Sequence, residues 1–310
     1  MAAEIFLHFL EQKKFKHMNN PFLGTGVALV TPFNDDRTID FDALAKLVEY
    51  QIDNGVNFLV VQGTTGESPT LSTDEKMAVL KCVYETNNGR LKIVYGVGGN
   101  DTVSTGEILK TLPSGIDGIL SVSPYYNKPS QKGIIEHFRY LASCTELPII
   151  LYNVPGRTGS NMLPETTLEL AKVENIVAVK EASGNMEQIM AVVHQRPEGF
   201  GVLSGDDAII MPLIAVGVDG VISVVANALP KKFSSMVDHA LKGDFDTARQ
   251  LHYDLLPSTN QFFAEGNPGG VKISLAEQNL MKPIMRLPLY PVSDKLEQEI
   301  RTETQRVLKA

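Results

Sequence analysis

The chain alternates between short runs of apolar, mostly β-branched residues and longer segments with apolar residues at helical spacing. One such run is GVALVTPF, at residues 26–33. A short run of this kind is typical of a strand buried on both faces of a parallel sheet. Seven further runs follow, and they begin at Asn57, Lys92, Gly118, Pro148, Ile176, Phe200 and Gly220. The pattern therefore predicts eight strands.

The segments between these runs have the pattern of amphipathic helices. In FDALAKLVEYQIDNG, residues 41–55, the apolar residues share one helical face and Gly55 ends the helix. The segment at 72–89 opens with Ser72 or Thr73 as its N-cap. Eight strand–helix units, spaced roughly 20 to 35 residues apart, predict a (β/α)8 TIM barrel. A doubly wound open sheet is the alternative, but the glycine-rich turn that usually follows its first strand is missing.

The chain divides into three expected parts. Residues 1–23 are predicted to be a disordered or extraneous leader, 24–228 the (β/α)8 barrel, and 229–310 a C-terminal helical region suited to subunit contacts. The apolar patch of the leader is short, and no small-residue cleavage site follows it, so it is a poor signal peptide. A weak amphipathic membrane anchor is the alternative.

Composition narrows the class of protein. The 310 residues include 43% hydrophobic and 21% charged residues, with a net charge of −8. No apolar stretch approaches the roughly 20 residues of a membrane helix, and no cluster of Lys and Arg suggests nucleic-acid binding. Cys82 and Cys144 fall in predicted helices, where we expect free thiols in a reducing cytoplasm.

Barrel enzymes carry their chemistry at the carboxyl ends of the strands. All six histidines fall in the leader or in predicted helices, so a metal-dependent aldolase would lack its ligands, and we expect no metal. The two carboxylates of SGDDA, residues 204–208, disfavour a phosphorylated substrate there. GVGGND at 96–101 lacks the spacing of a dinucleotide fingerprint, so we expect no cofactor.

One strand ends in an amine. IVAVKEAS, residues 176–183, places Lys180 at the end of a buried run, and a desolvated lysine is the nucleophile that forms a Schiff base with a carbonyl. The alternative is a lysine that reaches solvent. Tyr152 ends the preceding strand, so its phenol can relay protons beside that amine or simply fill the barrel top. Arg157, in the next loop, can bind a carboxylate or remain solvated.

With these residues and the pair Thr64 and Thr65, the sequence resembles the dihydrodipicolinate synthases of the pyruvate-dependent Schiff-base (class I) aldolase superfamily. The resemblance runs from about Gly24 to Arg301. Six motifs carry it in order: GTTGES at Gly63, SPYYNKPSQ at Ser123, LYNVPGRTG at Leu151, KEASGN at Lys180, LSGDD at Leu203 and GVISV at Gly220.

The resemblance implies catalytic roles for four residues. Lys180 would form the imine with pyruvate, and a proton relay would consist of Tyr152, Thr64 and Tyr126. Tyr126 would reach into the site of the neighbouring subunit. A homotetramer, built as a dimer of dimers, is therefore the expected assembly.

The resemblance also implies how substrates bind. Thr65, with the backbone around Gly205 and Ile222, would hold pyruvate, and Arg157 would hold the carboxylate of L-aspartate semialdehyde. The implied product is 4-hydroxy-tetrahydrodipicolinate, which enters diaminopimelate and lysine biosynthesis. The implied reaction requires neither a metal nor an organic cofactor.

Lysine inhibits some members of this family at a site on the dimer interface. Ser68, Asn100 and Tyr125 match that site, whereas Lys76 and Ser104 replace a histidine or acid and a glutamate. An added cation and a lost anion both weaken binding of a cationic ligand. We therefore expect weak or absent inhibition by lysine.

Two alternative functions remain at this stage. A sibling aldolase, such as an N-acetylneuraminate lyase or a sugar-acid aldolase, would share Lys180 and Tyr152, but Thr65 and Arg157 favour the synthase. A catalytically silent 2-oxo acid sensor would lack a relay residue, and all are present. The stretch EGNPGGVK, residues 265–272, departs from the prolines usual in the family, and the sequence assigns it no function.

Overall fold

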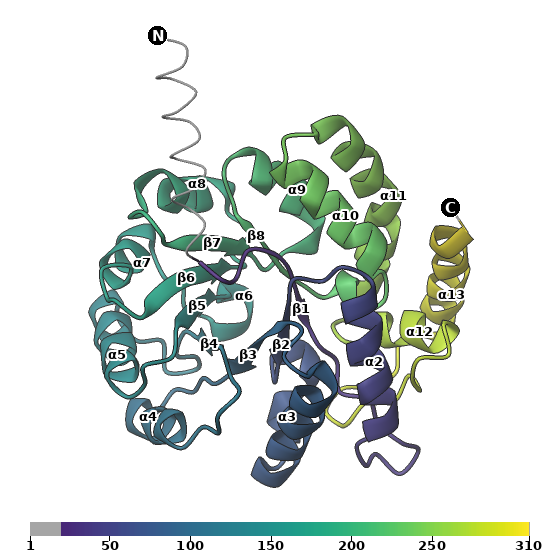
Figure 1. Cartoon of the computed structure of the whole chain (residues 1–310), viewed down its shortest axis with the longest axis horizontal. Helices are drawn as coiled ribbons and strands as arrows, with labels where there is room; N and C mark the ends of the chain where they lie inside the picture. Colours follow the sequence, from purple (N-terminus) through teal and green to yellow (C-terminus); the bar gives the residue numbers. More distant parts are fainter. Residues whose placement is uncertain (1–19, 310) are drawn as a thin grey trace.

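The computed structural model describes residues 20–309, which form a closed barrel of eight parallel strands paired in chain order (Figure 1). The strands are β1 (Gly24–Ala28), β2 (Phe58–Val61), β3 (Lys92–Gly96), β4 (Gly118–Val122), β5 (Ile149–Asn153), β6 (Ile176–Glu181), β7 (Gly201–Ser204) and β8 (Gly220–Ser223). The predicted eight strands and the predicted (β/α)8 barrel are confirmed. Residues 1–19 and 310 lie outside the described residues, and with them most of the predicted leader.

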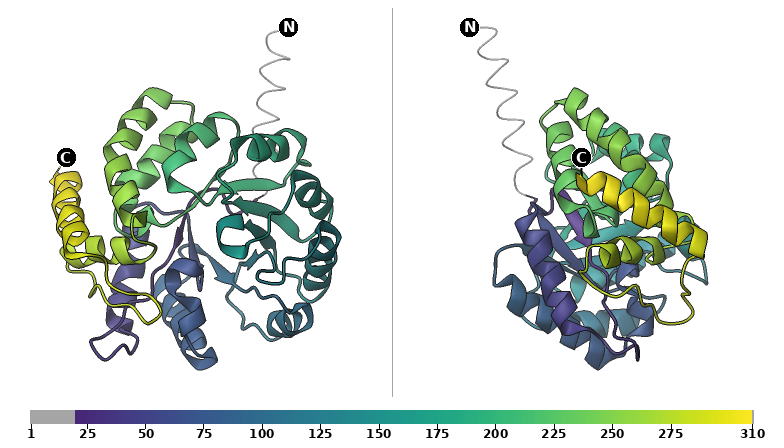
Figure 2. Two further views of the ribbon diagram at one scale, coloured as in Figure 1. Left: turned by 180° about the vertical axis from the view of Figure 1, so that it is seen from behind. Right: turned by 90° about the vertical axis from the view of Figure 1, so that its right-hand side faces the viewer.

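Helices surround the barrel and extend beyond its last strand (Figure 2). They are α2 (Phe41–Asp53), α3 (Thr73–Asn87), α4 (Thr102–Lys110), α5 (Gln131–Ser143), α6 (Pro155–Thr158), α7 (Pro164–Leu170), α8 (Met186–Gln195), α9 (Ile210–Ala215), α10 (Pro230–Leu241), α11 (Phe245–Phe263), α12 (Gly269–Glu277) and α13 (Asp294–Lys309). In the part of the chain that the structure describes, no helix is both long and apolar enough to cross a membrane.

Local sequence explains where the first helices begin and end. Ser72 caps α3, and its side chain and that of Glu75 bond each other's backbone N–H groups in a capping box. Helix α2 ends at Asp53, two residues before Gly55, which has a φ of 83°. Cys82 lies in α3 and Cys144 directly follows α5, and both are free thiols.

Apolar side chains fill the inside of the barrel and close its amino-terminal end. Phe22 is fully buried there, with its ring centroid 5.8 Å from that of Phe58. The Asn20 side chain donates a hydrogen bond to the Val177 carbonyl at 3.0 Å. Asn20 and Phe22 thus pack against the barrel, and the division of the chain at residue 23 stays a prediction.

The C-terminal region is helical as expected, and part of it belongs to the ring around the barrel. Helix α10 follows β8 and packs against β1 and α9, while α11, α12 and α13 pack on one another at one side (Figures 1 and 2). The boundary at residue 228 assigns α10 to the C-terminal region and stays a prediction. The packing of α10 favours a boundary after Leu241 instead.

A fully buried ion pair fastens the C-terminal region to the loop after β2. Lys272 of α12 donates to Glu67 at 2.5 Å, and neither side chain is exposed to solvent. The ammonium also donates to the carbonyls of Thr31 (2.8 Å) and Ile284 (2.7 Å), while Glu67 accepts from the backbone N–H of Arg286 (2.9 Å). Burial lowers the pKa of Lys272 to about 8, against the opposing effect of Glu67.

We expect Lys272→Met to lower the free energy of unfolding by about 3–5 kcal/mol, because the Glu67 carboxylate is then buried without a counter-charge. Adding Glu67→Gln should recover part of that loss, since it removes the stranded charge. Denaturant unfolding of both variants measures the effect.

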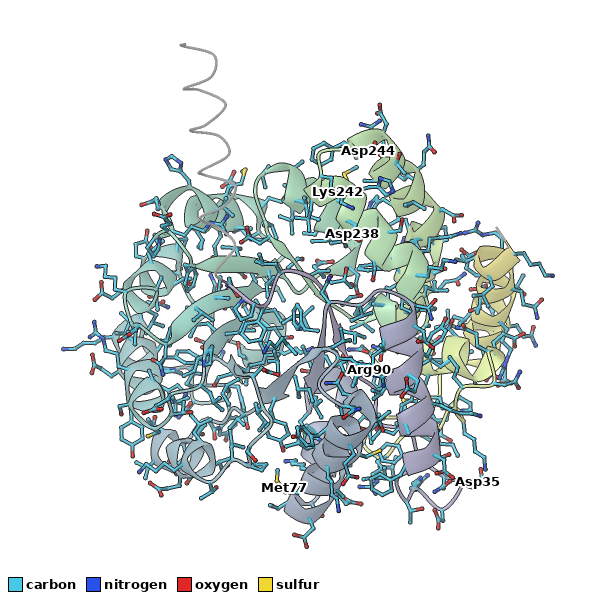
Figure 3. The ribbon with its side chains drawn as sticks, in the orientation of Figure 1. Asp35, Met77, Arg90, Asp238, Lys242 and Asp244 are labelled. Atoms are coloured by element: carbon cyan, nitrogen blue, oxygen red, sulfur yellow. The ribbon has the colours of Figure 1, made fainter. Side chains whose placement is uncertain are left out.

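Lys282→Met is the matched control, because it breaks the exposed ion pair of Lys282 with Asp35 at the molecular edge (Figure 3). Exposed pairs contribute little to stability. A Lys272→Met protein no less stable than this control would contradict the role assigned to the buried pair.

Candidate active site

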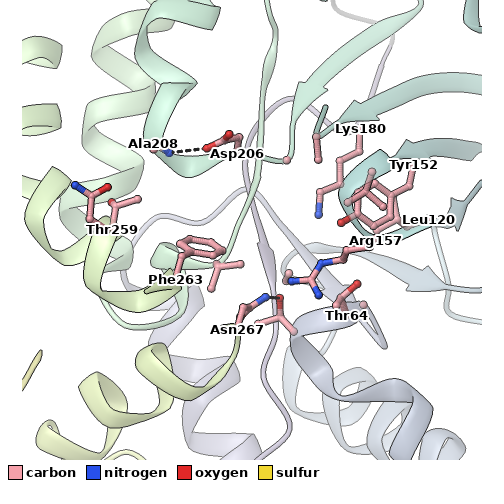
Figure 4. A pocket seen from close by; sticks show the side chains of 18 of the residues that line it. Thr64, Leu120, Tyr152, Arg157, Lys180, Asp206, Ala208, Thr259, Phe263 and Asn267 are labelled. Carbon is pink, nitrogen blue, oxygen red and sulfur yellow. Dashed lines mark hydrogen bonds between the residues drawn. The ribbon is translucent and has the colours of Figure 1, made fainter. Parts of the chain in front are cut away.

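A cavity of about 450 Å³ opens at the carboxyl ends of the strands (Figure 4). Six residues expected at the site line it: Thr64, Thr65, Tyr152, Arg157, Lys180 and Gly205. They come from the ends of β5 and β6 and from the loops after β2, β5 and β7. Closure of the barrel brings the ends of its strands together. It thereby gathers residues that are up to 141 positions apart in the sequence, from Thr64 to Gly205.

The amine of Lys180 lies against the ring of Tyr152. The two residues are register partners on β5 and β6, and Nζ is 4.4 Å from the ring centroid. Lys180 is only 6% exposed, and its amine has no ion-pair partner among residues 20–309. The predicted proximity of these residues at one level of the barrel is confirmed. The face of an aromatic ring attracts a lysine cation, but it accepts no proton and leaves the amine free for chemistry.

Gly205 gives the lysine side chain its space. A Cβ atom at this position would lie 2.8 Å from Cε of Lys180 and 2.6 Å from Cβ of Ala182. The backbone N–H of Gly205 is held by the carbonyl of Glu181 at 2.7 Å, so the loop cannot easily withdraw. A side chain here would displace the amine from its place beside Tyr152.

The cavity is suited to an anionic ligand. Lys180 and Arg157 bring two basic groups to its lining, and Asp206 brings one carboxylate, which accepts a hydrogen bond from the backbone N–H of Ala208. The Arg157 guanidinium points into the cavity from the short helix α6 (Figure 4) and has no ion-pair partner within residues 20–309. A planar guanidinium of this kind can bind a carboxylate through two hydrogen bonds.

Two residues expected at the site lie outside this cavity. Tyr126 is 86% exposed, with a φ of 71° in the loop after β4. Ile222 is buried inside the barrel on β8, with its side chain packed among apolar residues. A role for Tyr126 would therefore have to be exercised on another subunit, and one for Ile222 through its backbone.

The expected lysine-effector residues also lie away from the cavity. They are Ser68, Lys76, Asn100, Ser104 and Tyr125. The Asn100 side chain donates to the Tyr125 carbonyl at 3.3 Å, which joins the loops after β3 and β4.

The wall opposite Lys180 consists of residues that sequence reasoning did not identify. They come from α11 and the segment after it: Thr259, Asn260, Phe263, Ala264 and Asn267. Asn267 is 9% exposed, and its amide nitrogen donates to the Thr65 hydroxyl at 3.0 Å. The one sequence signal for Asn267 was that EGNPGGVK departs from the prolines usual in the family. Nothing in the sequence indicated that this segment lies over the barrel.

Two buried carboxylates hold the loops behind the cavity. Burial raises the pKa of Glu181, and hydrogen bonds from Gln188, Asn153 and Ser183 oppose the rise. Asp207 accepts from the backbone N–H groups of the Val224–Val225 turn at 2.9 and 3.1 Å, which joins the loops after β7 and β8.

No three His, Cys, Asp or Glu side chains among residues 20–309 are grouped so that they could hold a metal ion. The site residues expected from the sequence bring an amine, a phenol, two hydroxyls and a guanidinium to the cavity, and Asp206 adds a carboxylate. An amine beside a phenol can condense with a carbonyl while the phenol transfers protons.

Fold and site together define a (β/α)8-barrel lyase of the Schiff-base aldolase type. The model of the dihydrodipicolinate synthetase family matches residues 21–309, which is nearly the whole chain. The chain belongs to this family.

Relatives agree with this assignment. A 4-hydroxy-tetrahydrodipicolinate synthase of Parabacteroides distasonis is 50% identical over 280 residues, covering 90% of this chain and 94% of the relative. The solved dihydrodipicolinate synthase of Thermotoga maritima superposes with a TM-score of 0.91 at 38% identity, covering 94% of this chain and all of its own. That of Acinetobacter baumannii, solved with pyruvate, gives a TM-score of 0.89 at 39% identity, covering 92% and 98%.

The buried carboxyl of Asp207 generates a pH-dependent prediction. Burial raises its pKa to about 6, from an ordinary 3.8, against the lowering effect of its hydrogen bonds. Between these values the folded state holds a proton that the unfolded state has lost, so the contribution to stability falls as pH rises from 4 to 6. Since one pH unit corresponds to about 1.4 kcal/mol, the fall amounts to up to about 3 kcal/mol.

Asp207→Asn removes this titration and keeps an acceptor oxygen. Denaturant unfolding of both proteins from pH 4 to 7 should show the stability of wild type, relative to the variant, declining across that window. A difference that stays constant or grows with pH would show that Asp207 is not protonated in the folded state.

Proposed function

We propose that the chain condenses pyruvate with L-aspartate semialdehyde to 4-hydroxy-tetrahydrodipicolinate, the entry to diaminopimelate and lysine biosynthesis. The observation that carries the proposal is the Lys180 amine, buried beside Tyr152 in a cavity that also holds the Arg157 guanidinium; neither group has an ion-pair partner among residues 20–309. Family membership supports it, because relatives that match most of the chain are named for this reaction.

The reaction starts with attack of the Lys180 amine on the C2 carbonyl of pyruvate. Loss of water gives a protonated imine, which acidifies the pyruvate methyl group because the resulting carbanion is stabilised as an enamine. The enamine carbon adds to the aldehyde of the semialdehyde. The amino group of that substrate then displaces Lys180 as the ring closes, which regenerates the enzyme.

Proton transfers in these steps are assigned to Tyr152 and Thr64, together with Tyr126 of a neighbouring subunit. The proximity of Tyr152 to the amine supports its part in the relay. The exposure of Tyr126 in its own chain supports action in trans, in an assembly that we propose to be a homotetramer built as a dimer of dimers.

Substrate carboxylates are assigned to two places. Thr65 and the backbone near Gly205 and Ile222 would hold pyruvate close to the amine. The unpaired guanidinium of Arg157 would hold the semialdehyde, and its position on the cavity lining supports this assignment over a sugar-acid substrate.

Three further expectations belong to this proposal. The reaction requires no metal or cofactor, because the imine itself supplies the electron sink. Inhibition by lysine should be weak or absent, given Lys76 and Ser104 at the expected effector site. The free thiols of Cys82 and Cys144 support a reducing, cytoplasmic location.

Borohydride reduction in the presence of pyruvate should attach one reduced pyruvyl group to the protein, and peptide mapping should place it on Lys180. Lys180→Ala should take up no label and lose condensation activity. Lys272, the other lysine that is buried within residues 20–309, serves as an internal control and should stay unmodified. Wild-type protein that turns over N-acetylneuraminate but not aspartate semialdehyde in a coupled assay would instead identify a sibling aldolase.

Action of Tyr126 in trans makes a mixing experiment decisive. Tyr126→Phe and Lys180→Ala should each have low activity alone, because one lacks the relay and the other the nucleophile. Co-refolded hybrids contain sites with Lys180 from one chain and Tyr126 from the other, so they should regain part of the wild-type activity. Hybrids no more active than the separate variants would place Tyr126 outside the neighbouring site.

A further inference from the structure

Two segments about 200 residues apart in the sequence are joined at the edge of the cavity. Asn267 donates to the hydroxyl of Thr65 at 3.0 Å, and five residues later Lys272 donates to Glu67, two residues after Thr65, at 2.5 Å. The first bond lies at the cavity lining and the second is fully buried behind it. Neither Asn267 nor the ion pair takes part in the proposed covalent steps or proton transfers.

The bond from Asn267 fixes what the Thr65 hydroxyl can do. A hydroxyl has one proton and two acceptor sites. The Asn267 amide occupies an acceptor site, and within residues 20–309 the hydroxyl donates to no protein group, so its proton is available to a ligand. Thr65 is only 2% exposed and lines the cavity, and an available donor there is suited to a carboxylate oxygen.

The ion pair keeps both segments in register. The ammonium of Lys272 also donates to the Thr31 carbonyl at 2.8 Å, and the Thr31 hydroxyl donates to the Gly66 carbonyl at 2.7 Å. The backbone on the carboxyl side of Thr65 is therefore held at Gly66 and Glu67. Since both charged side chains are fully buried, separation of the two segments would leave a buried charge without its partner, which is costly.

The glycines of EGNPGGVK allow this approach. A Cβ atom on Gly270 would lie 2.6 Å from the Cα atom and 2.9 Å from the carbonyl oxygen of Phe262. Glycine thus lets the start of α12 pack directly on the end of α11, whose neighbouring residue Phe263 lines the cavity. This packing sets the depth at which Asn267 reaches Thr65.

We propose that Asn267 is a positioning residue for pyruvate: it holds the Thr65 hydroxyl as a hydrogen-bond donor to the substrate carboxylate, and the Glu67–Lys272 pair fixes the two segments that carry this bond. The inference rests on the proposed function, because it needs a 2-oxo acid at Lys180. It assigns to the C-terminal region a direct part in selecting a substrate with a carboxylate next to its carbonyl.

Asn267→Asp is the sharpest test, because it changes a donor into an acceptor of nearly the same shape. The carboxylate would accept the hydrogen bond of the Thr65 hydroxyl in place of the substrate, so the pyruvate concentration for half-maximal borohydride labelling, and the KM for pyruvate, should rise roughly 10- to 100-fold. The kcat at saturating pyruvate should change much less. The defect should shrink as pH falls toward the pKa of the new carboxyl group, because the protonated form can donate again.

Asn260→Asp is the matched control, since Asn260 lines the same cavity and has no hydrogen bond to Thr65. It adds the same charge and should produce a smaller, less pH-dependent change in the KM for pyruvate. Asn267→Ala should raise the KM less than Asn267→Asp does. In a Thr65→Val background, Asn267→Ala should have little further effect, because the bond it removes is already absent.

Several outcomes would overturn the inference. The first is half-maximal labelling of Asn267→Asp at the same pyruvate concentration as wild type, which would show that Thr65 does not need this donor. The second is additive effects of Thr65→Val and Asn267→Ala on the KM for pyruvate, which would show that the two residues act separately. If Asn267→Asp does not fold, the Thr65→Val and Asn267→Ala pair still decides the question. The same labelling experiment also tests the proposed function. If wild-type protein forms no pyruvate adduct, the proposed function itself is refuted.

Discussion

The site depends on a lysine amine that the barrel removes from water and that has no counter-ion in the part of the chain that the structure describes. Lys180 is 6% exposed, and its amine lies over the ring face of Tyr152, 4.4 Å from the ring centroid. Burial of a charge in such surroundings is unfavourable, so the protein bears a cost that packing alone would not require. A carbonyl compound that reacts with this amine explains three features of the site. They are the small residue Gly205, the register that pairs β5 with β6, and the Arg157 guanidinium on the cavity lining.

A second buried lysine shows what the alternative looks like. Lys272 is fully buried, and it donates to the Glu67 carboxylate and to two backbone carbonyls, which uses all three N–H donors of the ammonium. It holds structure, whereas Lys180 faces a cavity. The two lysines therefore have different roles. Lys272 fixes the loop that carries Thr64 and Thr65, and Lys180 presents its amine to a ligand that this loop binds.

Much of this could be predicted from the sequence because the signals are local. Eight apolar runs, the helical spacing between them and the rule that barrel chemistry lies at strand ends sufficed for the fold and for the proximity of Lys180 and Tyr152. The rest depends on contacts between distant residues. The bonds of Asn267 to Thr65 and of Lys272 to Glu67 join positions 202 and 205 residues apart, and no periodic pattern encodes such partners. Phe22 was missed for a similar reason, since one aromatic residue before the first strand does not show that it closes the barrel.

A crystal structure of the protein with pyruvate tests the central claim most directly. The account predicts continuous electron density from Nζ of Lys180 to C2 of pyruvate, with the carboxylate oriented toward Thr65. Pyruvate bound in the cavity at full occupancy without a bond to Lys180, or bonded to another residue, would contradict it.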